Sequence, residues 1–504
     1  MSRSKKLFTL AAAGLLALSI GTGVSAESTK DTLVIAEDVD CGTLAPTGPT
    51  ISTRTDIYLQ VYDGLFRFDG NSEMVPGLAT DWEWLDDTHI KFNLREGVKY
   101  HDGRDFTAKD VLFSIKLCQE DSNMVAVVTN VDYDACEILD DYTIVIAFTE
   151  KNAFNLSKLN MMNIVNEESY NESSDGMATS PVGTGPYKFE SSVPGASYTL
   201  VANEESWDKV PAIEHITFEV IPEASQRTNS LLAGEVDLVK ALQNSDYDYI
   251  GGMEEYTVGK RAGFNSTDIF FNMTENSPFV EKALRQAVCY TVDNEAMNTA
   301  AYGGLSIPCT GPWSVGMHDY DASWTNPMYD SPDFDKAKEL VDSVGAPSEP
   351  ITIIYGGDAA CETISQILQA NLAQIGITAE IVSVDSSVLW STMSDQTQWD
   401  IGLLGASAPS GYGLDSMTAF LTGLNFQGWS GENFDKLVEL CQTGAAASSD
   451  EERIAATKEI WDLVEEEVPL YAMVTLSNLY AHVSNLNYEV YDQFSLKGNN
   501  LIFS

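Results

Sequence analysis

Histidine, glycine loops and paired carboxylates are the residue types in this chain that could support catalysis. His101-Asp102-Gly103 places an imidazole beside a carboxylate, but Asp-Gly after a predicted strand is a turn signal. Gly183-Thr184-Gly185-Pro186 begins like a phosphate-binding glycine loop, yet the third glycine is missing and proline follows at once. The chain has neither a Walker A nor a GxSxG pattern. These motifs favour structural turns, and we expect no catalytic residues.

Seven cysteines and five histidines are the side chains that could bind metals or form disulfides. The histidines are scattered, and neither CxxC nor HExxH occurs, so we expect no metal site and no cofactor. The odd number of cysteines leaves at least one unpaired. The pairs nearest in sequence, Cys118–Cys136 and Cys289–Cys309, are the first disulfides that we predict.

The composition is strongly acidic, with 28 Lys and Arg against 75 Asp and Glu and a net charge of −47. Such a surface repels phosphate backbones and anionic lipid headgroups. We therefore expect no nucleic-acid partner and no binding to a membrane surface. The charge favours solubility, and it is also compatible with a preference for cationic or amine-bearing ligands.

Residues 1–26 have the pattern of a secretory signal peptide: basic residues, an apolar stretch at 7–20 and small residues before Ala26. The apolar stretch is shorter than the ~20 residues that span a bilayer. We predict cleavage after Ala26 and export to the periplasm or the outer face of the cell envelope. The nearest cysteine, Cys41, is too far from this site to be acylated, so no lipid anchor is expected.

The rest of the chain alternates between strand-like and helix-like segments, which predicts an α/β protein. His89–Leu94 alternates apolar and polar residues as a half-buried strand does. N-cap signals predict helices after Thr107, from Ser277-Pro278 and after Ser449. The second helix should bury Val280, Ala283, Leu284, Ala287 and Val288, and the third should bury Ile454, Ile460, Trp461 and Val464.

A βαβ unit is predicted from strand Ile351–Tyr355, helix Cys361–Gln374 and strand Thr378–Val384. Another apolar strand, Asp400–Leu404, is followed by the small residues of the segment Gly405–Gly413. Ligands of open α/β sheets bind beyond the carboxyl ends of the strands. Small residues there would let a ligand approach the backbone closely.

Three long stretches carry a resemblance to a known family. The first, Thr32–Ile115, contains VYDGLFRFDGN, VPGLATDWEW and FNLREGVKYHDGRDFTAKDVLFSI. The second, Pro181–Val239, begins PVGTGPYKFE, and the third is FFNMTENSPFVEKALRQAVCYTVDNEAM. In order and spacing they resemble extracellular solute-binding protein family 5, the peptide/nickel-type receptors of ABC importers. The resemblance extends more weakly to the end of the chain.

This resemblance implies a two-lobed α/β fold of the type II periplasmic-binding-protein (Venus-flytrap) class, with an extra domain inserted in the first lobe. Mapped onto this chain, lobe I comprises 31–64, 181–268 and 476–504, the insert is 65–180, and lobe II is 269–475. The chain would cross between the lobes near 270–272 and 473–475.

The resemblance also implies a receptor that captures peptides or similar small solutes between its lobes and delivers them to an ABC permease and ATPase complex. We expect a monomer. Peptide-binding members hold the ligand's amine terminus with an acid in the loop that here follows Leu404, whereas this chain has Ala406 and Ser407 there. Blocked peptides, small oligosaccharides, opines or a metal chelate therefore remain alternative ligands. A secreted hydrolase is the alternative from another class.

The resemblance and the βαβ unit together give a set of candidate ligand-binding residues. Tyr412 and Trp390 could stack on a ligand, although a core position is favoured for Trp390. Asp415 could align with a second, later acid of the family's loop, or it could cap the following helix. The full set is Asp40, Cys41, Gly42, Trp390, Gly405, Ala406, Ser407, Tyr412 and Asp415.

Overall fold

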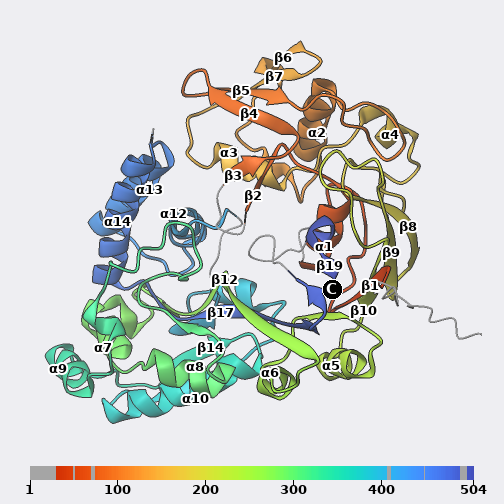
Figure 1. Ribbon diagram of the computed structural model, residues 1–504. Coiled ribbons are helices and arrows are strands. Elements are labelled where there is room, and N and C mark those ends of the chain that lie inside the picture. The colour runs from red at the N-terminus through yellow and green to blue at the C-terminus, as the bar shows by residue number, and fades with distance from the viewer. Residues whose placement is uncertain (1–29, 49–51, 70–73, 406–409, 448, 489–496) are drawn as a thin grey trace, which may run out of the picture.

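The computed structural model describes residues 30–48, 52–69, 74–405, 410–447, 449–488 and 497–504. The predicted signal peptide and the candidates Ala406 and Ser407 lie outside these ranges. One sheet of eleven strands organises most of the molecule, in the order β15-β14-β16-β12-β17-β11-β1-β10-β9-β8, with β13 paired to β17 beside this path. A separate four-stranded sheet has the order β4-β5-β7-β6. Figure 1 shows the arrangement.

Two long antiparallel strands, β12 (Tyr256–Phe271) and β17 (Leu470–Val483), lie in the middle of the main sheet. We name the part of the molecule on the β11 side of this pair lobe I and the part on the β16 side lobe II. The expected boundaries at 268/269 and 475/476 fall inside the two strands. The two lobes therefore share one sheet.

The β12–β17 pairing is interrupted where the ladder passes from Ala262–Ser477 to Ser266–Thr475. β12 has three residues in this interval, Gly263 to Asn265, and β17 has one. Extra residues of this kind bend a strand and increase its local twist. The irregularity lies several residues before the expected crossing at 270–272.

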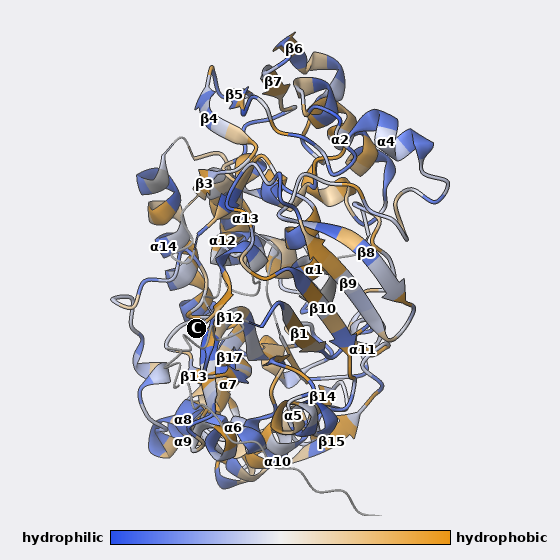
Figure 2. Cartoon of the chain, turned by 45° about the vertical axis from the view of Figure 1, so that its right-hand side comes forward, coloured by the Kyte–Doolittle hydropathy of each residue, from blue (hydrophilic) through white to orange (hydrophobic). Residues whose placement is uncertain are grey.

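Lobe I is built on parallel pairing of β1 with β10 and β11. Figure 2 shows largely apolar β1 and β9 in this part of the sheet. Apolar side chains of the strands and α1 form its core. Its elements are β1 Thr32–Glu37, α1 Ser52–Val61, β8 Tyr187–Val193, β9 Ser197–Ala202, β10 His215–Val220, α5 Ala224–Ala233, β11 Leu238–Lys240, α6 Asn244–Gly251, β18 Leu486–Asn487 and β19 Ile502–Phe503.

The insert has its own core between the four-stranded sheet and α2 (Ala108–Glu120). The predicted capping box is present: the Thr107 amide donates to Asp110 Oδ2 at 2.8 Å. The predicted strand at 89–94 alternates in burial as expected. The remaining elements are β2 Phe66–Phe68, β3 Met74–Pro76, β4 Ala79–Trp84, β5 His89–Leu94, β6 Glu137–Asp140, β7 Thr143–Ala147, α3 Asn155–Lys158 and α4 Glu167–Glu172.

Lobe II contains the predicted βαβ unit. β14 (Ile351–Tyr355) pairs in parallel with β15 (Ala379–Ser383) and with β16 (Ile401–Leu404), and α10 (Ala359–Gln374) connects β14 to β15. Its other elements are α7 Lys282–Cys289, α8 Asn294–Tyr302, β13 Ile307–Pro308, α9 Phe334–Val344, α11 Leu389–Met393, α12 Gly413–Met417, α13 Glu432–Ala445 and α14 Asp450–Glu467.

Several expected details are wrong. Ser277 caps a short 3₁₀ turn, Pro278–Val280, before α7 begins, and Val280 is 46% exposed because it precedes the amphipathic helix. Ile454 is also 46% exposed on α14. Of the seven cysteines, Cys118, Cys136, Cys289 and Cys309 are free thiols, so the predicted pairs Cys118–Cys136 and Cys289–Cys309 are not formed. Six of the seven cysteines are buried, and a buried site suits a neutral thiol. In the described part of the chain, no helix is both long and apolar enough to cross a membrane.

The glycine turn at 183–185 joins the insert to lobe I. The ring of His101 lies against it, with Nε2 2.9 Å from the Gly185 carbonyl oxygen and Nδ1 3.3 Å from the Gly183 amide nitrogen. Burial lowers the pKa of His101 to about 4, so the ring is neutral near pH 7. A Cβ on Gly185 would lie 2.3 Å from the Gln60 carbonyl oxygen of α1. Both motifs therefore have a structural role, since His101 and the glycine turn contact each other where the insert meets lobe I.

We expect Gly185→Ala to lower the free energy of unfolding by on the order of 3 kcal/mol, because the new methyl group meets rigid backbone rather than a movable side chain. Chemical denaturation measures this change. Gly252→Ala is the control, since its Cβ would approach the nearest atom no closer than 3.5 Å. Equal stability of the two variants would contradict the packing argument.

Candidate ligand site

The carboxyl end of β16 lies against the irregular part of β12. Gly405 follows β16 directly, and a Cβ there would stand 2.7 Å from the Ser266 carbonyl oxygen. Gly405 itself is exposed. Only glycine permits this close approach of the two backbones. Backbone at this edge is therefore accessible, as expected for a ligand site beyond parallel strands.

Tyr412 is half-buried where lobe II meets the insert. Its ring centroid lies 5.4 Å from that of Phe154, which comes from the insert, and 5.0 Å from that of His318. The Arg453 guanidinium lies 4.7 Å from the ring centroid, a cation–π distance. His318 also stacks on Phe68 of β2 at 5.7 Å. These contacts link the insert to lobe II.

Asp319 holds the turn that carries Tyr412. Its Oδ1 accepts from the Gly413 amide at 2.6 Å and its Oδ2 from the Leu414 amide at 3.0 Å. Burial raises the pKa of Asp319, while the two amides and Arg453 act in the opposite direction. The carboxylate thus caps α12 from another part of the chain. Asp415 lies inside the first turn of α12, so the expectation that it caps this helix is wrong.

Trp390 lies on the surface, with 43% of its area exposed, so the favoured core position is wrong. Its ring packs against Phe420 at 5.8 Å and against Phe426 at 5.7 Å. α11, which carries it, follows the carboxyl end of β15. The position is therefore one where an exposed aromatic ring can contact a solute.

The candidates of lobe I follow the carboxyl end of β1. Cys41 is fully buried in the lobe I core and is therefore not available to a ligand in this conformation. Gly42 is exposed, with a positive φ of 70°. Asp40 Oδ1 accepts from the Gly42 amide at 3.2 Å and from the Tyr198 hydroxyl. The turn is thus held by its own carboxylate.

A buried charged cluster lies at the same ends of β1 and β11. It consists of Glu37, Asp56 of α1 and Lys240, with Lys240 paired to Asp56. Burial raises the pKa of Glu37 to about 8; Lys240 opposes this shift, and the hydrogen-bonded Asp56 and nearby Asp38 add to it. Burial disfavours the charge on Lys240, but Asp56 and Glu37 outweigh it and raise the pKa of Lys240. Glu37 therefore holds a proton near pH 7.

Sequence reasoning missed His318, Asp319 and Arg453. Asp319 and Gly413 lie 94 positions apart, so no local pattern connects them. The only available signal was the run His318-Asp319, a polar pair between apolar segments. Such a pair is equally typical of a surface turn.

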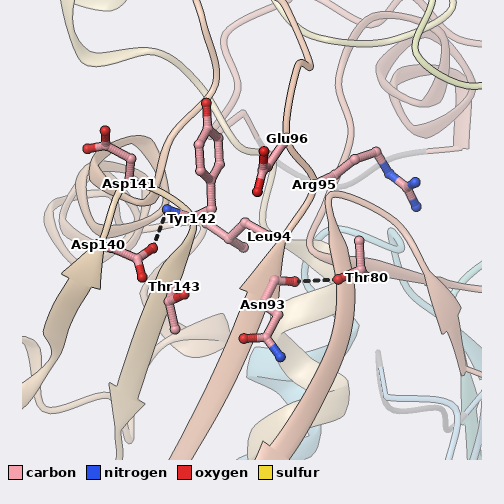
Figure 3. Close-up of a pocket in the computed structure, with 9 residues that line it drawn as sticks. All are labelled: Thr80, Asn93, Leu94, Arg95, Glu96, Asp140, Asp141, Tyr142 and Thr143. Carbon is pink, nitrogen blue, oxygen red and sulfur yellow. Dashed lines mark hydrogen bonds between the residues drawn. The ribbon is translucent and has the colours of Figure 1, made fainter.

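The cavity drawn in Figure 3 lies elsewhere, in the insert. It has a volume of about 650 Å³ and is lined by Thr80, Asn93, Leu94, Arg95, Glu96, Asp140, Asp141, Tyr142 and Thr143. Several of its polar groups form hydrogen bonds within turns and between strands, as in the 2.8 Å bond from the Tyr142 amide to Asp140 Oδ1. It does not adjoin the candidate residues. Among the described residues, no three His, Cys, Asp or Glu side chains are grouped to hold a metal ion.

Comparison with known proteins agrees with this geometry. A family model described as bacterial extracellular solute-binding proteins, family 5 Middle, matches residues 73–428. The chain belongs to this family. Heme-binding protein A of Haemophilus influenzae is 28% identical over 426 residues, covering 76% of this chain and 77% of that protein. Di/tripeptide-binding protein 1 of Pseudomonas aeruginosa is 27% identical over 461 residues, covering 81% and 82%.

Solved structures share the fold of this family 5 protein. NikA from Brucella suis, in complex with Fe(III)-EDTA, superposes with a TM-score of 0.83 at 20% identity and covers 94% of this chain and 100% of that one. The two-lobed α/β fold is thus common to the two chains. Fold alone does not decide the ligand.

The raised pKa of Glu37 predicts how the stability of this solute-binding protein depends on pH. Because Glu37 is protonated in the folded state at pH values where it ionises in the unfolded chain, its contribution to stability is complete below about pH 4.5 and is lost as the pH rises through about 8. Glu37→Gln should remove this loss, which amounts to at most about 1.4 kcal/mol per pH unit. Urea denaturation between pH 5 and pH 8 measures it.

Glu219→Gln, on the neighbouring strand β10, is the control and should leave the pH dependence unchanged. If wild type and Glu37→Gln show the same slope of unfolding free energy against pH, Glu37 does not carry the proton.

Proposed function

We propose that this protein captures peptides or similar small solutes between its two lobes and delivers them to an ABC permease and ATPase complex. The observation that carries the proposal is the joining of two lobes through β12 and β17, with the accessible backbone at Gly405 beside the joint. Membership in family 5 supports the receptor role. The protein is proposed to act as a monomer at the outer side of the membrane, after removal of residues 1–26.

Binding by such a receptor is a shift between open and closed arrangements of the lobes. A solute that contacts both lobes binds the closed state more tightly, and only this difference in affinity drives closure. Main-chain groups at the ends of β16 and β1 can satisfy the amide groups of a peptide by strand addition. Gly405, Tyr412 and Trp390 are the proposed contacts from lobe II, with Asp40 and Gly42 from lobe I.

The proposed ligand class is peptide rather than heme or a metal chelate. The described residues of the site contribute backbone, aromatic rings and carboxylates, which suit a peptide with an amine or a basic side chain. The named ligands of the relatives differ, including heme and di- or tripeptides. Peptide capture therefore needs a direct test.

The test is native mass spectrometry of the protein purified without added ligand, followed by denaturation and identification of the released molecules. We expect released peptides of a few residues, and binding of a mixed di- to pentapeptide pool to the emptied protein. Release of heme, a sugar or a metal chelate, with no peptide binding, would contradict the proposal. Turnover of the added peptides would indicate a hydrolase.

Trp390→Ala should weaken binding of the identified peptide by about tenfold, because truncating an aromatic contact costs on the order of 1–2 kcal/mol. Isothermal titration calorimetry measures the affinity. Trp84→Ala is a matched control, since Trp84 is 45% exposed and lies on the insert. Unchanged affinity in Trp390→Ala would remove this residue from the site.

A further inference from the structure

The segment Cys309–Asp319 crosses the joint between the lobes and contacts β17 first. The Cys309 amide donates to the Met473 carbonyl oxygen at 2.9 Å. The Val315 amide donates to Thr475 Oγ1, also at 2.9 Å. Thr475 pairs with Ser266, directly after the irregular stretch of β12, and Met473 is the residue of β17 that is skipped between the pairs Thr267–Val474 and Asp268–Ala472. The segment is therefore fixed to one of the two lobe-connecting strands.

The same segment is fixed to the irregular stretch of β12. Ser314 Oγ donates to the Gly263 carbonyl oxygen at 2.7 Å. A Cβ on Gly316 would lie 2.3 Å from that same oxygen, so the two backbones touch. Phe264 completes the contact, with its ring centroid 5.2 Å from that of His318. Gly263 and Phe264 are two of the three residues that interrupt the ladder.

The far end of the segment holds the turn formed by residues 410–414. The His318 amide donates to the Gly411 carbonyl oxygen at 2.9 Å. Asp319 accepts from the amides of Gly413 and Leu414. A Cβ on Gly411 would lie 2.7 Å from His318 Nε2 and 2.5 Å from the Phe264 ring, so turn, segment and β12 are in mutual contact.

Close packing makes this segment stiff. Trp313, Ser314, Met317 and Asp319 are all buried, and Trp313 packs edge-on against Trp461 of α14 at 4.6 Å. Well-packed elements transmit a displacement rather than absorbing it. A segment held at both ends by hydrogen bonds cannot move at one end alone without breaking them.

We infer that the segment 309–319 is a strap that couples the irregular stretch of β12 to the turn at 410–414, with Asp319 as the positioning residue for that turn. When the lobes rotate, the backbone change concentrated at Gly263–Asn265 is passed through Ser314 and Asp319 to the turn. A solute that contacts Tyr412 then favours one lobe arrangement through the same bonds. This last step rests on the proposed function, whereas the coupling itself does not.

The test is hydrogen exchange measured by mass spectrometry on the full protein without ligand. Asp319→Asn should speed amide exchange by about tenfold in peptides covering 410–417, because one acceptor becomes a donor. If the strap couples the two regions, this variant should also show faster amide exchange in peptides covering 259–267. Asp400→Asn is the matched control: its carboxylate also accepts a backbone amide, that of Thr352 at 2.8 Å, but at the other end of β16. It should leave both regions unchanged.

Ser314→Ala tests the strap from its other end. It also provides a test of the coupling if Asp319→Asn fails to fold. Faster exchange at 410–417 in this variant supports the coupling, since Ser314 bonds to Gly263 and not to the turn. Faster exchange confined to the mutated end, in whichever variant is folded, would overturn it. The exchange experiment uses no ligand, so its outcome does not depend on the proposed function. If the wild-type protein binds no peptide, the proposed function is refuted but the exchange result still tests the coupling.

Discussion

The antiparallel pairing of β12 with β17 is the interaction on which the rest of the structure depends. These two strands run through both lobes, so their hydrogen bonds connect what would otherwise be two separate sheets. Backbone pairing is directional, and it sets the angle between the lobes more tightly than side-chain contacts alone would. The irregular stretch at Gly263–Asn265 is then the natural place for that angle to change.

Polar groups are buried on both sides of this joint, at a cost that hydrogen bonds and charge pairing offset. In lobe I, Lys240 compensates Asp56 and Glu37 keeps its proton. In lobe II, Asp319 is satisfied by two helix amides. Each group would be costly without its partners, so each fixes the local backbone in one arrangement. Such rigid edges around a movable joint suit a protein that binds by closing.

Much of the fold could be predicted because its signals are local. Thr107 and Asp110 are three residues apart and cap α2 as expected, and the βαβ unit at 351–383 follows from apolar runs of strand and helix length. Errors arose where an exact position mattered: Val280 precedes its helix, and proximity in sequence did not bring Cys118 to Cys136. Periodicity identifies an element, but its first residue depends on competing caps.

For the site, the sequence by itself determined that Gly405 follows a strand, β16. It also determined family membership, through motifs spread along the chain. Only the tertiary structure decided that Asp319 caps α12, that Trp390 is exposed and that Cys41 is buried. The physical reason is that burial and hydrogen-bond partners depend on contacts between residues far apart in sequence, which no local spacing encodes.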